Sequence, residues 1–430
     1  MGRRGNGTDD DVARWMIEGG TSGDPAAGPT RARIDEPVPD DAHARFEAAG
    51  DLLWEACRRE PDVEAIDRIL AQRPEPEIVV PAAMAHGLGP MLWRALGAAG
   101  ARAALGERAG DLETADKVRR LEAAILLPRA VALAIGPLTG AGFEPLILKG
   151  PLLAQRYPEP WLRSMEDLDV YLPRRQHLSA LRALEAAGWH VVRAGGFDRY
   201  DTVLRHPEVP TLALELHYGL EAWYKRTTAI DAAGLWRRRV PVDCMGSPAF
   251  GLPPAEELVA LAQHAGKPFH SFSRLIWVAD LVMVVADCAE RGVEVDWEAV
   301  VDLARRGRCT GVVTTAMRMA RRIGLCVPEE LLGPVTPTWR ADALARLEDP
   351  TWPLACSDEE IFHLRFALAD SRLRRMGLLV GSRYIRSEVP FRRWATDVPV
   401  ETISRCRRWY RSRSGGGRSP RASTGVPTAR

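Results

Sequence analysis

The chain has 430 residues, of which 46% are hydrophobic and 27% charged, the balance of a globular protein with two or three domains and a large core. A formal net charge of +1 gives no global electrostatic preference for nucleic acid or for a membrane surface. Seven cysteines, none in a CxxC pair, predict reduced and mostly buried thiols in a cytoplasmic protein and argue against a zinc site.

The beginning of the chain is rich in Gly, Asp, Pro and Arg without hydrophobic periodicity, so residues 1–42 are predicted to form a disordered tail. From residue 43 to 135, apolar side chains recur at three- and four-residue spacing and predict a helical region. A Gly-Leu-Gly at residues 87–89 follows no strand, so a helix C-cap is expected there and not a phosphate loop. The longest uncharged apolar stretch, residues 130–143, is too short to span a bilayer, and no membrane contact is expected.

The pattern changes near residue 140, and residues 136–250 are predicted to form an α+β core with a small mixed sheet. Short apolar runs bounded by turn residues predict strands, and one stretch between them has helical periodicity. The expected strands lie in "FEPLILKG", "DLDVYLP", "HVVRAG" and "TLALELHYGL", and the expected helix lies in "RQHLSALRALEAAGW".

Helical periodicity returns after the core and predicts a second helical region over residues 251–410, in which one helix could divide at Gly311. Residues 411–430 are basic and of low complexity, which predicts a disordered tail. A solvated tail is the favoured interpretation, and a weak contact with nucleic acid or a membrane surface is the alternative.

Two aspartates stand two residues apart in the apolar stretch "DLDVYLP". Residues two apart in a strand face the same side, so Asp167 and Asp169 would project together while Leu168 and Val170 enter the core. Two carboxylates about 4 Å apart repel by roughly 4 kcal/mol at an effective dielectric constant near 20. A divalent cation would remove this cost, and Mg²⁺ prefers carboxylates together with substrate phosphates. The pair therefore indicates a site for metal-assisted phosphoryl or nucleotidyl transfer.

Glu215, a charge in the apolar strand "LALELHYGL", is the candidate third carboxylate. An Asp-x-Asp by itself is more often a surface or capping pair, and a lone strand glutamate is more often a salt-bridge partner. The combination with a Lys-Gly pair that ends an upstream strand favours a metal site.

In this order, "LILKG", "RYPEP", "LRSMEDLDVYL" and "LELHYGL" resemble the bacterial uncharacterised nucleotidyltransferase family of the DNA polymerase beta-like nucleotidyltransferase superfamily. A weaker match follows in "LAQHAGKPFHSFSRLIWVADL". The wider superfamily usually has Gly-Ser or Gly-Gly where this chain has Lys149-Gly150, which favours the narrower family. The resemblance implies a small mixed-sheet core that uses Mg²⁺ or Mn²⁺ and takes ATP or another NTP as substrate.

The resemblance also implies roles for individual residues. Asp167, Asp169 and Glu215 would ligate the metals, and Glu215 could help deprotonate an acceptor hydroxyl. Gly150 would let a phosphate approach the backbone closely. Lys149 would either neutralise triphosphate charge or pair with the carboxylates.

Further residues of the matched stretches have two interpretations each. Arg163 would contact phosphate or hold the aspartate strand in place, and His217 would support the nucleotide site or be a satisfied strand histidine. Tyr157 is expected to pack in the core in preference to stacking on a base.

Two residues of the downstream helices, His264 and Asp280, are not expected to be catalytic. A helix histidine is more often structural, and a carboxylate in the apolar helix "LIWVADLVMVV" should be paired. Arg274 and Lys267 are the expected partners of Asp280.

The leading hypothesis is an enzyme that moves a nucleoside monophosphate from an NTP to a hydroxyl of a small-molecule or protein acceptor. One alternative is a catalytically degenerate nucleotide-binding scaffold or sensor. Another is a nucleotidyltransferase that acts on RNA, which the balanced net charge makes less favoured.

Overall fold

The computed structural model describes residues 40–195, 200–220, 228–267, 270, 272–333 and 345–349, together with Trp352, Leu354, Ala367 and Leu368. The chain divides into units of residues 1–43 and 44–430, and the candidate site lies in the second. The predicted C-terminal tail, residues 1–39 of the predicted N-terminal tail and most of the predicted helical region beyond residue 333 lie outside the described residues. Residues 40–42, predicted as tail, are helical.

Helices precede the sheet, as the apolar spacing predicts. They are α2 (Asp40–Ala56), α3 (Val63–Leu70), α4 (Pro76–Ala85), α5 (Gly89–Leu105), α6 (Ala109–Leu121) and α7 (Leu127–Gly140). After α4, Gly87 has φ of 73° and the amide of Leu88 donates to the carbonyl of Ala83 at 2.8 Å. This is the hydrogen bond of a helix C-cap, so that prediction is confirmed.

One helical run among the described residues, Gly89–Gly140, is long and apolar enough by length and composition to cross a membrane. It includes residues 130–140 of the uncharged stretch considered above and begins far before that stretch. The run is interrupted at Gly97, where φ is 65°, and a third of its apolar window (33%) is buried in the protein. A core helix passes the same test, so the expectation of no membrane contact stays a prediction.

Seven strands form one mixed sheet in the order β3-β4-β5-β2-β1-β7-β6. Their bounds are β1 (Leu146–Ile147), β2 (Asp167–Tyr171), β3 (His190–Arg193), β4 (Asp201–Arg205), β5 (Ala213–His217), β6 (Val240–Cys244) and β7 (Ser247–Gly251). β2 pairs in parallel with β5 and β1 with β7, and the other neighbours are antiparallel. The predicted α+β fold with a mixed sheet is confirmed.

Four strands and the helix between them match the sequence prediction, with α9 at His177–Ala186. β4, β6 and β7 were not predicted. β6 and β7 are hard to predict because they contain Pro241 and Pro248, and proline usually argues against a strand. Here Pro241 lies on the edge strand β6, and the only β1–β7 pairing joins Leu146 with Phe250, away from Pro248.

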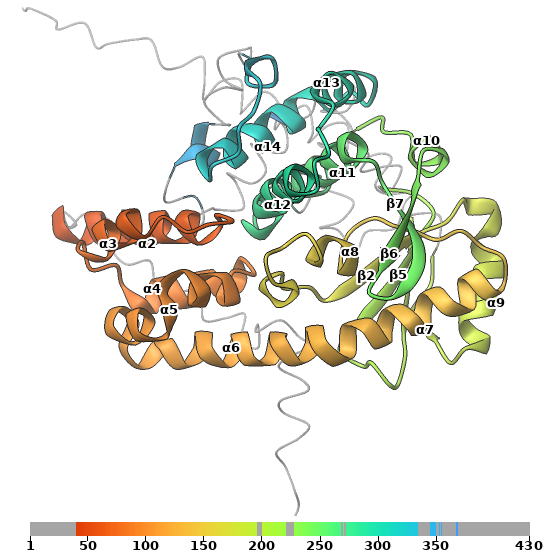
Figure 1. Ribbon diagram of the computed structural model, residues 1–430, viewed down its shortest axis with the longest axis horizontal. Coiled ribbons are helices and arrows are strands. Elements are labelled where there is room, and N and C mark those ends of the chain that lie inside the picture. Colours follow the sequence, from red (N-terminus) through yellow and green to blue (C-terminus); the bar gives the residue numbers. More distant parts are fainter. Residues whose placement is uncertain are drawn as a thin grey trace, which may run out of the picture. The chain divides into compact units, whose positions relative to one another are not determined.

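The two faces of the sheet are packed differently (Figure 1). Side chains such as Leu168, Val170 and Leu214 form one hydrophobic cluster with residues of α7 and α9. The opposite face lies toward helices that follow the sheet, and Leu146 and Tyr171 join their larger cluster. Alternation along the strands therefore separates a mostly apolar face from one that carries more polar groups.

The helices after the sheet are α10 (Ala232–Arg237), α11 (Pro254–Gly266), α12 (Ile276–Glu290), α13 (Trp297–Arg306) and α14 (Thr310–Arg322). The predicted helical pattern is confirmed here, although the break between α13 and α14 falls at residues 307–309, before Gly311. The five cysteines in the described part of the chain are free thiols, and only Cys326 is exposed.

Candidate active site

The polar face of the sheet gathers three carboxylates, Asp167, Asp169 and Glu215, which we call the acidic cluster. Asp167 and Asp169 alternate along β2 with core side chains. The parallel register of β2 and β5 sets Asp169 directly beside Glu215. The sequence predicted both pieces, and the structure brings them together across neighbouring strands.

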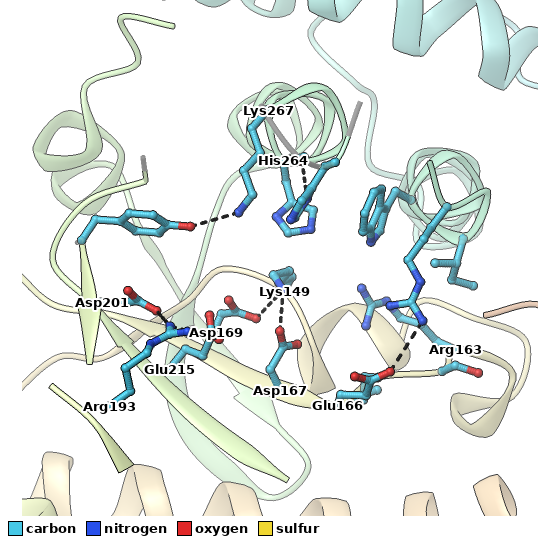
Figure 2. A pocket seen from close by; sticks show the side chains of 17 residues that line it. Lys149, Arg163, Glu166, Asp167, Asp169, Arg193, Asp201, Glu215, His264 and Lys267 are labelled. Atoms are coloured by element: carbon cyan, nitrogen blue, oxygen red, sulfur yellow. Dashed lines mark hydrogen bonds and ion pairs between the residues drawn. The ribbon is translucent and has the colours of Figure 1, made fainter. Parts of the chain in front are cut away.

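A turn after β1 positions Lys149 against the acidic cluster. Gly150 has φ of 72°, and a Cβ there would lie 3.0 Å from the carbonyl oxygen of Asp167. Only glycine fits this close approach without strain. The Nζ of Lys149 lies 3.1 Å from Oδ2 of Asp167 and 2.8 Å from Oδ2 of Asp169, and Figure 2 shows it above the two carboxylates. Of its two predicted roles, pairing with carboxylates is the one that the structure contains.

His217 contacts the acidic cluster from the end of β5. Its Nε2 lies 2.8 Å from Oδ1 of Asp169 and 3.4 Å from Oε2 of Glu215. Burial lowers the pKa of His217, but the hydrogen bonds with Asp169 and Glu215 outweigh it and raise that pKa to about 9. The imidazole is therefore a cation that donates to Asp169 at neutral pH.

The three carboxylates differ in how far Lys149 and His217 offset the effect of burial on their pKa. Burial and the neighbouring Asp169 charge raise the pKa of Asp167, although Lys149 opposes them. Burial also raises the pKa of Asp169, but the charge of Lys149 and the hydrogen bond from His217 bring it well below its usual range. For Glu215, burial is likewise outweighed by the hydrogen bond from His217, so its pKa is lowered.

Charge and hydrogen bonding both indicate room for a cation. Arg193 lies 4.0 Å from Glu215 but pairs with Asp201, so the three carboxylates have Lys149 and His217 as their closest cations and keep surplus negative charge. Oδ2 of Asp169 is buried and accepts no well-aligned hydrogen bond, although Lys149 is near. Ligand atoms of Asp169, Glu215 and His217 lie within 4.8 Å of one another, although His217 could join as a ligand only after losing its proton. A donor set dominated by carboxylate oxygens suits Mg²⁺ or Mn²⁺.

A cavity of about 400 Å³ lies above the acidic cluster. This volume is near the lower end of the usual range for small-molecule pockets, roughly 300–1,000 Å³. The sheet supplies its floor, and α11, α12 and the segment between them supply a facing wall, where Figure 2 shows His264 and Lys267. The cavity can therefore hold one small ligand between a charged floor and helix side chains.

Arg163 lines this cavity but is committed to a buried ion pair. Its Nε donates to Oδ1 of Asp280 at 2.8 Å and its Nη2 donates to Oδ2 at 3.0 Å, while the hydroxyl of Tyr157 donates to Oδ1 at 2.6 Å. We call these three residues the α12 anchor. It ties the segment before β2 to α12, which favours the strand-holding role of Arg163 and the packing role of Tyr157.

The expected partners of Asp280 are wrong. Arg274 instead lies 3.5 Å from Glu166 and donates to the carbonyl of Ala85. Lys267 donates to the hydroxyl of Tyr200 at 3.4 Å. Spacing along a helix could not reveal Arg163 as the partner, because it comes from a segment 117 residues earlier.

Several cavity residues were missed in the sequence. Arg193, at the end of β3, pairs with Asp201 of β4 and lies 4.0 Å from Glu215. Asp201 belongs to a strand that was not predicted, so its place beside His217 in the register had no sequence signal. Trp277 lies in the downstream stretch "LAQHAGKPFHSFSRLIWVADL", which weakly resembles the family. That resemblance could have identified Trp277 as a candidate site residue.

A model of a family described as "Uncharacterised nucleotidyltransferase" matches residues 73–324, more than half of the chain. No curated protein matches the sequence. No solved structure matches it either.

Proposed function

The chain belongs to the uncharacterised nucleotidyltransferase family, and on that premise we propose that it transfers a nucleoside monophosphate from an NTP to a hydroxyl of an acceptor, with release of pyrophosphate and with Mg²⁺ or Mn²⁺ as the cofactor. The observation that carries the proposal is the acidic cluster, three carboxylates that two neighbouring strands bring side by side at the floor of the cavity. A small molecule or a protein is the favoured acceptor.

Asp167, Asp169 and Glu215 would hold the metal. When bound, a divalent cation supplies neutralisation of phosphate charge and stabilisation of the leaving pyrophosphate. The hydrogen bonds of His217 hold the carboxylates of Asp169 and Glu215 in their orientation. These carboxylates therefore need not reorient during the reaction.

In the transfer itself, the acceptor oxygen attacks the α-phosphorus while the bond to the pyrophosphate oxygen breaks. The hydroxyl proton passes to a carboxylate, for which Glu215 is the candidate because it lines the cavity beside Asp169. Lys149 starts between Asp167 and Asp169, and a metal bound there would free its ammonium group to contact phosphate. Both roles predicted for Lys149 then belong to successive states of one site.

The test is incubation of the protein with α-labelled ATP, GTP, CTP and UTP and Mg²⁺ or Mn²⁺, in the presence of small-molecule, protein or RNA fractions. Transfer of label to one fraction, with release of pyrophosphate, is expected. An RNA acceptor would show binding that weakens steeply with salt. NTP binding that needs metal, without turnover on any fraction, would instead support the scaffold or sensor.

The matched variant is Asp167→Asn combined with Asp169→Asn, which keeps side-chain size and removes two charges. It is expected to lose metal-dependent NTP binding. If the wild-type protein binds no NTP, or if the double variant binds metal and NTP unchanged, the proposal fails.

A further inference from the structure

Part of the cavity wall opposite the acidic cluster is aromatic. Three rings, of His264, His270 and Trp277, line the cavity from α11, from the segment after it and from the first turn of α12. The rings of His270 and Trp277 are stacked, with centroids 4.5 Å apart and an interplanar angle of 16°. His264 meets both edge-on, at 4.5 Å and 5.3 Å. We call this group the ring wall.

Each ring of the ring wall is only partly buried, while α11 and α12 are otherwise packed into the core. In α11, ten of the 13 residues are buried, and His264 is among the exceptions. Trp277 is likewise half-buried between the buried residues Ile276 and Val278. The surface that these rings leave uncovered belongs to the cavity.

The ring wall is uncharged, whereas most of the other residues that line the cavity are charged. Of the 17 described residues that line the cavity, ten are Asp, Glu, Lys or Arg. Burial, together with the charges of Lys267 and Lys149, lowers the pKa of His270 to about 2. The same causes lower the pKa of His264 well below its usual range. Both imidazoles are therefore neutral at physiological pH and offer no charge to a phosphate.

The hydrogen bond of His270 fixes how its ring is presented. Its Nδ1 lies 2.9 Å from the carbonyl oxygen of His264, which can only accept, so Nδ1 carries the proton. This bond holds the His270 ring in place against Trp277. A rigid, neutral pair of stacked rings is a surface suited to another planar ring, because stacking tolerates any heterocycle with a π face.

We propose that the ring wall is the nucleobase subsite of the cavity, with the base of the NTP resting against Trp277 and His270 while its phosphates face the acidic cluster. This inference rests on the proposed function and extends it. Division of the cavity into a charged floor and a neutral aromatic wall matches the division of a nucleotide into phosphates and base. Stacking also gives affinity without strong preference among bases.

The experiment compares ligands with and without a base. Binding of ATP, GTP, CTP, UTP and inorganic tripolyphosphate, each with Mg²⁺, is measured by calorimetry on the wild-type chain, Trp277→Leu and Trp277→Phe. Trp277→Leu is expected to weaken NTP binding about tenfold while tripolyphosphate binding changes less than about twofold. Trp277→Phe, which keeps a ring, is expected to recover most of the NTP affinity.

Trp236→Leu is the matched control, because Trp236 is a half-buried tryptophan of α10 that does not line the cavity. It should leave both ligand classes unchanged. If Trp277→Leu does not fold, His270→Leu removes the stacking partner and is expected to show the same selective loss.

Equal weakening of NTP and tripolyphosphate, or no change in either, would overturn the inference and leave the proposed function standing. Failure of the wild-type chain to bind any NTP with Mg²⁺ would overturn both.

Discussion

The acidic cluster and the α12 anchor are both buried groups of charge around the same cavity, yet they are balanced differently. In the anchor, one guanidinium meets one carboxylate through two hydrogen bonds, and Tyr157 adds a third. In the acidic cluster, three carboxylates share Lys149 and His217, and one buried oxygen lacks an aligned donor. A balanced group serves the fold, whereas surplus charge is tolerated where a ligand will complete it.

The largest expected effect is on stability, in the anchor. Asp280→Ala would leave the buried Arg163 guanidinium without its counter-charge and is expected to cost about 3–5 kcal/mol in the free energy of unfolding. Denaturant-induced unfolding measures it. Asp302→Ala, which removes an exposed pair with Arg306 on α13, is the control and should change little. Equal effects of the two variants would mean that the anchor is not a structural ion pair.

The next effect is on activity, in the acidic cluster. Asp167→Asn is expected to lower the rate of nucleotidyl transfer by about two to three orders of magnitude, as loss of one charge-stabilising group does. The metal-free protein should become slightly more stable, because burial and Asp169 disfavour the ionised form of Asp167. Turnover and thermal unfolding of the same sample check both. A variant that loses activity and stability together would contradict the contrast between cluster and anchor.

A smaller effect is expected when the ammonium group of Lys149 is removed. Lys149→Met deletes the ammonium group that lies between Asp167 and Asp169. With this competitor gone, Mn²⁺ should bind the nucleotide-free protein a few-fold more tightly, while NTP affinity falls. Paramagnetic resonance titration with Mn²⁺ measures the first change and calorimetry the second. Weaker Mn²⁺ binding would mean that Lys149 supports the metal site and does not compete for it.

The smallest effect concerns the ion pairs of Arg156, whose charge balance is intermediate between that of the acidic cluster and that of the α12 anchor. Arg156 contacts both Glu257, at 2.6 Å, and Asp287, which Arg291 also contacts, so Glu257 shares its ion-pair partner with a second carboxylate. Burial and the Asp287 charge outweigh Arg156 and raise the pKa of Glu257 to about 7. The folded state then binds this proton more tightly than the unfolded state, whose glutamate titrates near 4.5. Stability should therefore decrease as pH rises from about 4.5 to about 7.

Glu257→Gln removes this titration and should flatten that part of the pH profile. Unfolding free energies at several pH values between 4 and 8, for both proteins, provide the measurement. An unchanged slope would show that Arg156 fully compensates the charge of Glu257.

Much of the acidic cluster could be predicted from local rules. Strand alternation placed Asp167 and Asp169 on one side, and the cost of charge in an apolar strand singled out Glu215. The glycine after Lys149 likewise indicated a turn, and its φ of 72° agrees with that. These inferences succeed because alternation and backbone sterics act within a few residues.

Long-range pairing was beyond the sequence. The partner of Asp280 was assigned to nearby Arg274 or Lys267, whereas the guanidinium of Arg163 reaches it from a distant segment. β4 was overlooked, and Asp201 with it. The sequence by itself determined which residues are too costly to bury alone, because transfer of charge out of water depends on residue type. Only the tertiary structure decided which charges are balanced and which are left in surplus, because that depends on what the register of β2 with β5 and the packing of α11 and α12 bring within a few ångströms.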